Sequence, residues 1–264
     1  MFEPPPLSKP GLMVTATDTG VGKTVVSCAI AAAWRGRHGE KSRRTLGVCK
    51  PFGSGCRLDR RGQLVHEDAE ALAGVSGCDQ PLEVINPLRY AAPLAPAVAA
   101  EAEGRPVDWP RLAESLRVLD AASDALLIEG VGGIMVPLDP RRPRFMVAQL
   151  AAAIGYPVVV VCRPNLGTLN HTAMTVELLR QAGCRVGGLV INGVDPDPAA
   201  VREDPSLRTN AAWLERMTGA KVLAKLPRGR GVSPAALAEG RIDAALVAAA
   251  DRLDWAEVMR RPHR

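Results

Sequence analysis

Residues 13–24 read Met13-Val14-Thr15-Ala16-Thr17-Asp18-Thr19-Gly20-Val21-Gly22-Lys23-Thr24. An apolar run, Leu12 to Thr15, leads into a turn of small residues, and a helix-competent segment follows from Lys23 to Arg35. Backbone N–H groups in such a turn and at the helix start converge on phosphate oxygens. Gly22 lets the backbone approach closely, the Lys23 ammonium can neutralise β- and γ-phosphates, and the Thr24 hydroxyl can ligate Mg²⁺. The segment therefore predicts a nucleotide-binding phosphate loop.

This loop departs from the strict pattern G-x-x-x-x-G-K-[ST], because Thr17 stands where the pattern has its first glycine. In a loop one residue longer, Ala16 would stand there instead. A chance Gly-Lys-Thr at a helix start is the alternative interpretation, and the strand before it and the helix after it argue against that. The loop alone leaves the reaction open, since it serves many chemistries.

The rest of the chain alternates strand-like and helical segments. Three runs are continuously apolar, which is typical of strands buried on both faces in a parallel sheet; they are Ala125–Ile128, Pro157–Cys162 and Val186–Ile191. Further strands are expected at Thr45–Cys49 and Val222–Leu226. Helices are expected at Glu67–Ala73, Trp109–Asp120, Asn170–Ala182, Leu207–Thr218 and Ile242–Met259, and an exposed loop at Asp195–Pro205.

This alternation predicts a doubly wound α/β fold with a mostly parallel sheet flanked by helices, of the P-loop NTPase type. We expect residues 11–264 to form a single P-loop α/β domain that follows a Pro-rich N-terminal extension, residues 1–10.

Composition limits the functional classes. The net charge of +5 fits a protein that handles anionic small molecules. The basic stretches Lys41–Arg44 and Arg260–Arg264 lack interleaved aromatic residues, so neither nucleic acid nor a membrane is expected as a partner. The six cysteines form no C-x-x-C pair, and no signal peptide or membrane-spanning run is found. We therefore expect a cytoplasmic protein.

Ordered motifs resemble those of the dethiobiotin synthetases, the enzymes of the penultimate step of biotin synthesis. The phosphate loop is similar to that family's longer loop, T-G-T-D-T-x-V-G-K-T. The likeness continues in the family's order through Lys50–Gly55, Glu67–Ala69, Pro87–Pro96, Ile128–Gly133, Arg163–His171 and Val190–Asn192. These motifs span most of the chain, and their order is far more specific than one loop.

The resemblance implies an ATP- and Mg²⁺-dependent ligase of biotin biosynthesis that forms C–N bonds. Members close a cyclic urea on 7,8-diaminopelargonate with CO₂ or bicarbonate, which yields dethiobiotin. A carbamate formed on one amine attacks the γ-phosphorus, and the second amine closes the resulting carbamic–phosphoric anhydride. Negative charge develops on the carbamate and the transferring phosphoryl group, so cations and positioning should supply most of the catalysis.

The resemblance also implies roles for particular residues of this chain. Catalysis is carried over to Lys50, Lys23 and Thr19, and magnesium binding to Thr24, Asp68 and Glu129. Nucleotide and metal binding together involve Gly20, Val21, Gly22, Lys23, Thr24, Asp68, Glu129, Gly132, Asn192 and Pro227, of which Asn192 and Pro227 would contact the adenine. Substrate binding involves Thr19, Lys50, Ser54, Gly167, Thr168, Leu169 and Asn170. In the family the partner subunit contributes the segment Gly167–Asn170, so a homodimer with shared sites is expected.

Some residues depart from the family pattern. Ala16 replaces the usual loop glycine, which is tolerable only at negative φ. Gly193 stands where some relatives have Asp, and Pro93–Pro96 lacks the Ser and His of others. The basic loop Arg141–Arg144 has no counterpart. These departures bear on base specificity more than on the class of reaction.

Two other functions remain open. Amidating cobyrinic-acid synthases share the fold, but they carry a glutaminase domain for which 264 residues leave no room. Partitioning ATPases carry a signature lysine near the start of the loop, where this chain has Thr17 and Asp18. Their basic membrane helix has no clear match in Ile242–Arg264, which also carries four acids.

Overall fold

The computed structural model describes residues 2–39, 44–195 and 197–260. The basic stretches Lys41–Arg44 and Arg260–Arg264 noted above therefore lie almost wholly outside the described residues. In the described part, six parallel strands form the central sheet in the order β12-β11-β10-β1-β7-β2. Their bounds are β1 Gly11–Ala16, β2 Leu46–Cys49, β7 Ala125–Gly133, β10 Val158–Cys162, β11 Val186–Val194 and β12 Val222–Pro227. The predicted parallel α/β fold is confirmed.

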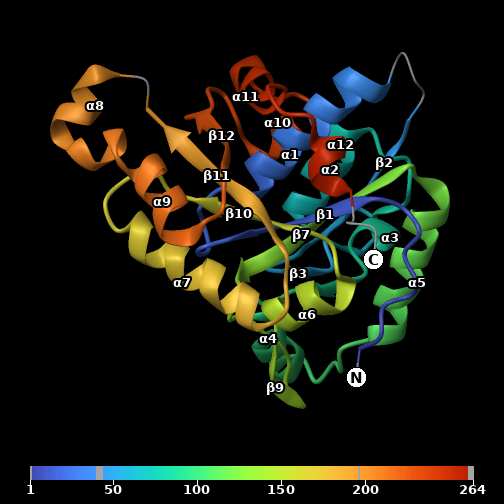
Figure 1. Cartoon of the computed structure of the whole chain (residues 1–264). Coiled ribbons are helices and arrows are strands. Elements are labelled where there is room, and N and C mark those ends of the chain that lie inside the picture. The colour runs from blue at the N-terminus through green and yellow to red at the C-terminus, as the bar shows by residue number, and fades with distance from the viewer. Residues whose placement is uncertain (1, 40–43, 196, 261–264) are drawn as a thin grey trace.

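Helices cover both faces of this sheet (Figure 1). One face carries α1 Lys23–Trp34, α2 Glu67–Ser76, α10 Pro234–Ala238, α11 Ala244–Ala250 and α12 Trp255–Met259. The other carries α5 Trp109–Ala122, α6 Val147–Ile154, α7 Thr168–Gln181 and α9 Asn210–Thr218. Strands buried on both sides need no polar alternation, which explains runs such as Val158 to Cys162.

Shorter elements complete the described chain. They are β3 Phe52–Ser54 paired with β6 Leu88–Tyr90, β4 Arg57–Leu58 paired with β5 Leu64–Val65, and β8 Pro137–Asp139 paired with β9 Arg142–Met146. The short helices are α3 Leu82–Ile85, α4 Pro96–Ala102 and α8 Pro198–Glu203, with a π-helical turn at Arg35–Gly39 and a 3₁₀ turn at Pro205–Arg208. The basic loop Arg141–Arg144 belongs to the β8–β9 hairpin.

Two sequence-based predictions were wrong. The expected terminal helix Ile242–Met259 is two helices, because the Asp254 side chain accepts the Ala256 N–H and starts α12 after a turn. The expected loop Asp195–Pro205 contains α8, which begins at Pro198 with the Asp197 carboxylate accepting the Ala199 N–H. Proline is tolerated in the first turn of a helix, where its missing N–H would have no partner.

The described part of the Pro-rich N-terminal extension packs onto the α5 side of the sheet. Phe2 and Leu7 are buried, and the Phe2 ring lies 5.1 Å from the Trp109 ring. The Asp120 carboxylate accepts the N–H groups of Ser8 and Lys9 at 2.9–3.0 Å. That residues 1–10 form an extension separate from a single domain of residues 11–264 stays a prediction. Among the described residues, no helix has the length and apolar character needed to span a bilayer.

The topology places one edge of the sheet where ligands bind. The chain leaves β1 for β2, returns to β7 beside β1, and then crosses to β10 on the other side of β1. Strand order thus reverses at β1, and α/β sheets bind ligands beyond the carboxyl ends of strands at such a point. Thr17 directly follows β1, and Glu129 lies within β7 opposite Val14, four residues before that strand ends.

Candidate active site

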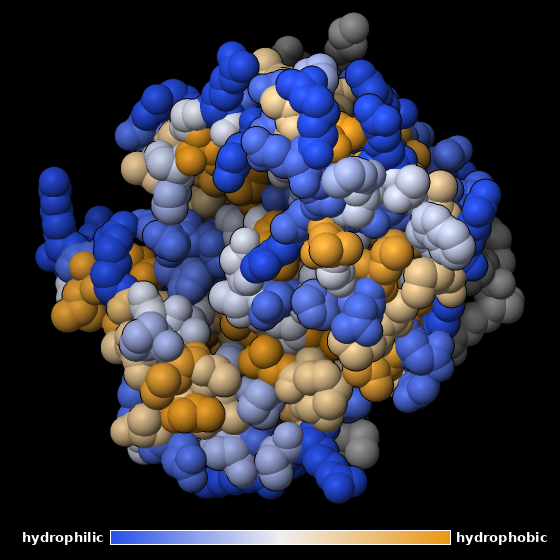
Figure 2. Space-filling model, turned by 90° about the vertical axis from the view of Figure 1, so that its left-hand side faces the viewer, coloured by the Kyte–Doolittle hydropathy of each residue, from blue (hydrophilic) through white to orange (hydrophobic). Residues whose placement is uncertain are grey.

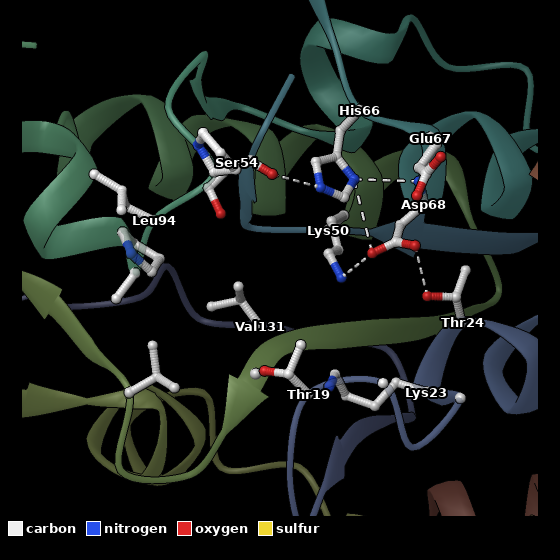
Figure 3. Close-up of a pocket in the computed structure, with 17 residues that line it drawn as sticks. Thr19, Lys23, Thr24, Lys50, Ser54, His66, Glu67, Asp68, Leu94 and Val131 are labelled. Carbon is white, nitrogen blue, oxygen red and sulfur yellow. Dashed lines mark hydrogen bonds and ion pairs between the residues drawn. The ribbon is translucent and has the colours of Figure 1, made fainter. Parts of the chain in front are cut away.

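A cavity of about 500 Å³ opens at the carboxyl ends of β1 and β7 (Figure 3). Segments far apart in the sequence line it. They are the phosphate loop with Thr19, Lys23 and Thr24, the segment from the end of β2 through β3 with Lys50 and Ser54, the start of α2 with His66 and Asp68, and β7 with Val131 and Gly132. Most of the residues predicted for phosphate, metal and catalysis therefore meet in one place.

The phosphate loop has the backbone that its sequence predicts. Gly20 and Gly22 have φ of 72° and 93°. Gly22 is the N-cap of α1 and offers no side chain to the first N–H groups of the helix, which leaves these groups to bind an anion. The Lys23 side chain is 7% exposed, and its ammonium donates to the Asp18 carbonyl at 3.3 Å. Ala16 belongs to β1 and is paired with Val161, so its backbone is extended and a methyl group is tolerated.

Lys50, Asp68 and Glu129 form a buried ionic cluster. The Lys50 ammonium lies 2.7 Å from Asp68 Oδ2 and 2.7 Å from Glu129 Oε1, and it donates to the Gly130 carbonyl at 3.2 Å. Lys50 is 2% exposed and Glu129 is 0% exposed. An ionised carboxylate so far from water is stable only with a partner charge, and Lys50 provides it.

The contacts of the cluster favour the ionised forms of Lys50 and Asp68. Burial alone would lower the pKa of Lys50, but the charges of Glu129 and Asp68 outweigh it, so that pKa lies above its ordinary value. Burial would raise the pKa of Asp68, and the Lys50 charge more than offsets this, which lowers the pKa to about 2. Burial and the nearby Lys50 charge both lower the pKa of Lys23.

The three predicted magnesium ligands converge. The Thr24 hydroxyl lies 2.7 Å from Asp68 Oδ1 and 2.9 Å from Glu129 Oε1, although it has one hydrogen to donate. The second oxygen of Glu129, Oε2, is buried and has no hydrogen-bond partner in the described part of the chain. Two carboxylates and a hydroxyl beside a phosphate loop match what Mg²⁺ takes from proteins, with phosphate oxygens and water completing its shell. These residues fit the ion.

His66 is a site residue that the sequence analysis did not single out. Its Nδ1 accepts the Asp68 N–H at 3.2 Å, so in neutral imidazole Nε2 carries the proton and donates to the Ser54 carbonyl at 3.1 Å. Burial lowers the pKa of His66, and the Lys50 charge lowers it further. His66 thus joins the end of β3, which carries Ser54, to the start of α2, which carries Asp68. Its position directly before Glu67-Asp68 was the available signal.

A second cavity, of about 690 Å³, adjoins the phosphate loop and shares Gly20 with the first. Val21, Asn192 and Pro227 line it, so the residues predicted to contact the adenine lie together. Asn192 also has a local role: its Nδ2 donates to the Val21 carbonyl at 2.9 Å and ties β11 to the loop. Gly193, one of the departures noted above, lines the same cavity.

The segment from Gly167 to Asn170 lies outside both cavities. Gly167 caps α7, whose first turn follows the 81%-exposed Leu166. The Thr168 side chain is buried and lies 3.4 Å from the Thr172 hydroxyl, so it faces the interior. Within one chain, this predicted substrate-binding segment is therefore separate from the other predicted site residues.

The fold and the phosphate site together define a P-loop NTPase. Among solved structures, the chain is similar to a chain of the MinC:MinD cell division protein complex of Aquifex aeolicus, with a TM-score of 0.53 at 13% identity over 92% of this chain and 95% of that one. It is also similar to a ParA family ATPase of Chlorobium tepidum, with a TM-score of 0.52 at 11% identity over 95% and 99% of the two chains. At these identities the likeness shows the fold alone.

Sequence relatives are more specific. A model of the AAA domain family matches residues 10–236. The chain is 44% identical to the ATP-dependent dethiobiotin synthetase of Anaeromyxobacter dehalogenans strain 2CP-C, over 90% of this chain and 98% of that protein. It is 36% identical to that of Bacillus licheniformis, over 85% and 88%. The chain belongs to the dethiobiotin synthetase family, whose members are ATP-dependent enzymes that form C–N bonds.

A matched pair of substitutions tests the phosphate loop. Gly20→Ala and Gly22→Ala both place alanine at positive φ, which costs about 1 kcal/mol of backbone strain. A Cβ at Gly22 would also clash with Asn192 Nδ2, whereas nothing lies near a Cβ at Gly20. We expect Gly22→Ala to weaken ATP binding at least about tenfold more than Gly20→Ala, because the clash displaces the helix start from the phosphates. Titration with a fluorescent ATP analogue measures this, and equal losses would contradict it.

Proposed function

We propose that this chain synthesises dethiobiotin from 7,8-diaminopelargonate, CO₂ and ATP. The observation that carries the proposal is the meeting of the phosphate loop, Lys50 and Asp68 in one cavity, with the buried Glu129 in contact with Lys50 and Thr24. Membership of the dethiobiotin synthetase family supports the choice of substrate. We expect this chain to act in the reducing cytoplasm, where thiols such as its six free cysteines stay reduced.

The cavity suits an amphipathic diamine. Its charged and polar lining comes from Lys50, Asp68 and the phosphate loop, while Leu94, Val131 and Val136 give it an apolar wall. Figure 3 shows Leu94 and Val131 across the cavity from Thr24. Such a wall can bury the methylene groups of an aliphatic substrate, which contributes about 0.8 kcal/mol for each group.

Phosphoryl transfer needs negative charge to be neutralised and oxygens to be aligned. The loop N–H groups and the Lys23 ammonium would hold the β- and γ-phosphates. Thr24, Asp68 and Glu129 would hold Mg²⁺, which when bound neutralises charge on the phosphate oxygens. A carbamate oxygen on the substrate attacks the γ-phosphorus, and ADP leaves. The second amine then attacks the carbonyl carbon of the anhydride, and phosphate leaves as the urea ring closes.

The chain's own side chains would position and stabilise these steps. The Lys50 ammonium, freed from the carboxylates, would lie between the carbamate and the γ-phosphate and stabilise their shared negative charge. The Ser54 and Thr19 hydroxyls line the cavity and would hydrogen-bond the diamine. In the second cavity, Asn192 keeps its amide oxygen for an adenine amino group while Nδ2 holds the loop.

We further propose that a second copy completes the site. The start of α7 favours an anion such as the substrate carboxylate, yet within one chain it lies outside the cavity. The adjoining surface exposes apolar side chains on and near α7 and α9, namely Leu166, Met174, Trp213 and Met217. Figure 2, which faces the side where α8 and α9 lie in Figure 1, shows apolar residues on this face around hollowed surface. An isologous homodimer would cover such residues.

The reaction is tested directly by product analysis. The purified protein is incubated with 7,8-diaminopelargonate, bicarbonate and MgATP. We expect a product heavier than the diamine by one CO₂ less one water, together with ADP and phosphate, and no ATP consumption when either diamine or bicarbonate is omitted. Mass spectrometry and phosphate release measure both. Absence of the ring-closed mass would discard the substrate while leaving the nucleotide site intact.

Subunit complementation tests the shared site. Lys50→Ala removes the proposed catalytic cation, and Asn170→Asp places a repelling charge at the exposed start of α7, where an acid does not harm the helix. Each variant alone should be inactive. Co-expressed with different tags, they should recover up to about a quarter of wild-type activity, because half of the dimers are mixed and each mixed dimer has one intact site. No recovery in purified mixed dimers would place both elements within one chain.

A further inference from the structure

In this structure the Lys50 ammonium is fully engaged away from any substrate. An ammonium has three hydrogens to donate, and Lys50 has three acceptors: Asp68 Oδ2, Glu129 Oε1 and the Gly130 carbonyl. With its side chain 2% exposed, it has no hydrogen left for a carbamate or a γ-phosphate. The catalytic role proposed above therefore requires Lys50 to leave these acceptors.

The oxygens that hold Lys50 belong to the proposed metal ligands. Glu129 Oε1 faces both the Lys50 ammonium and the Thr24 hydroxyl, at 2.7 and 2.9 Å. Asp68 also binds both residues, but with different oxygens: Oδ2 accepts from Lys50 and Oδ1 accepts from Thr24. An ammonium and a divalent cation cannot both occupy the space between these carboxylates. Binding of the metal and binding of Lys50 to the acid pair therefore exclude each other.

Charge decides which cation is present. Lys50 is the cation in contact with both carboxylates and offsets one of their two negative charges, while the second lysine, Lys23, donates to the Asp18 carbonyl. Without Lys50, the fully buried Glu129 would carry an uncompensated charge, which is strongly unfavourable. A metal ion that binds without nucleotide must displace the Lys50 ammonium from the carboxylates. Lys23 is a second positive charge in the same cavity and opposes this. A metal ion that arrives with a triphosphate brings anionic oxygens that can accept both lysines.

We propose that Lys50 acts as a stand-in for the metal ion: it is the cation held by Asp68 and Glu129 in the nucleotide-free enzyme, and the metal–nucleotide complex displaces it toward the substrate. This rests on the proposed function, since it takes the metal site from there. Metal entry and activation of Lys50 become one event. The enzyme then binds free metal weakly, and the catalytic cation is presented only when the phosphates are in place.

Direct binding of Mn²⁺, an oxygen-preferring ion that reports on Mg²⁺ sites, tests this in the absence of nucleotide. MnCl₂ is titrated into wild type, Lys50→Gln and Lys23→Gln, and free Mn²⁺ is read by electron paramagnetic resonance. Lys23→Gln is the matched control, since it removes the same charge from the same cavity but leaves the acid pair held by Lys50. We expect Lys50→Gln to bind Mn²⁺ at least about tenfold more tightly than wild type, and Lys23→Gln to change by less than about threefold.

Thermal unfolding gives a second readout that does not need activity. Lys50→Gln should melt below wild type without metal and gain more stability than wild type from MnCl₂, because the ion replaces the lost cation. If that variant does not fold, Lys50→Arg keeps the charge, and it should bind free Mn²⁺ as weakly as wild type. Equal Mn²⁺ affinity of wild type and Lys50→Gln, or equal tightening in Lys23→Gln, would overturn the proposal.

These outcomes separate the inference from the function on which it rests. If wild type closes the ring and binds Mn²⁺ with ATP, yet Lys50→Gln binds free Mn²⁺ no better than wild type, only the stand-in role is wrong. If none of the three proteins binds Mn²⁺ with or without ATP, both the proposed metal site and the proposed stand-in role of Lys50 are wrong.

Discussion

A carboxylate with no access to water, Glu129, stands midway along β7 in the interior of the sheet, and the structure of the site follows from its need for a neighbouring cation. Glu129 is fully buried because β7 lies between β1 and β2, and the register pairs it with Val14 of β1. A charge at this place needs a cation within a few ångströms. Lys50 reaches it from the end of β2, and Thr24 reaches it from the start of α1.

The same constraint relates catalysis to folding. Each group of the cluster comes from a different segment, and each segment is fixed by an element with its own apolar contacts: β1 and α1 for the loop, β2 for Lys50, α2 for Asp68 and β7 for Glu129. Only the assembled sheet brings these charges together. His66 and Asn192 then hold neighbouring segments in place through single hydrogen bonds to backbone groups, to Ser54 and Val21 respectively. The segments that line the two cavities are thus tied together by side chains of the chain itself.

Much of this could be predicted from the sequence, for physical reasons. Continuous apolar runs specify buried parallel strands, and a Gly-Lys-Thr after such a strand specifies a phosphate loop. The side chains predicted to bind the metal ion were placed by family motifs, and the structure brings them within hydrogen-bond distance of one another. What sequence patterns missed depends on tertiary contacts. His66 matters because of two backbone groups, only one of which is near in sequence. Phe2 and Leu7 are buried in a Pro-rich leader only because α5 offers a surface for them. The chain end predicted as one helix is divided at Asp254, where local capping prevails over apolar periodicity.

A crystal structure with Mg²⁺ and a non-hydrolysable ATP analogue tests the central claim most directly. We predict an ion whose shell includes Thr24 Oγ1 and the Asp68 and Glu129 carboxylates, directly or through one water. We also predict that the Lys50 ammonium moves off Glu129 toward the γ-phosphate. An ion held elsewhere, with Lys50 still bound between Asp68 and Glu129, would contradict it.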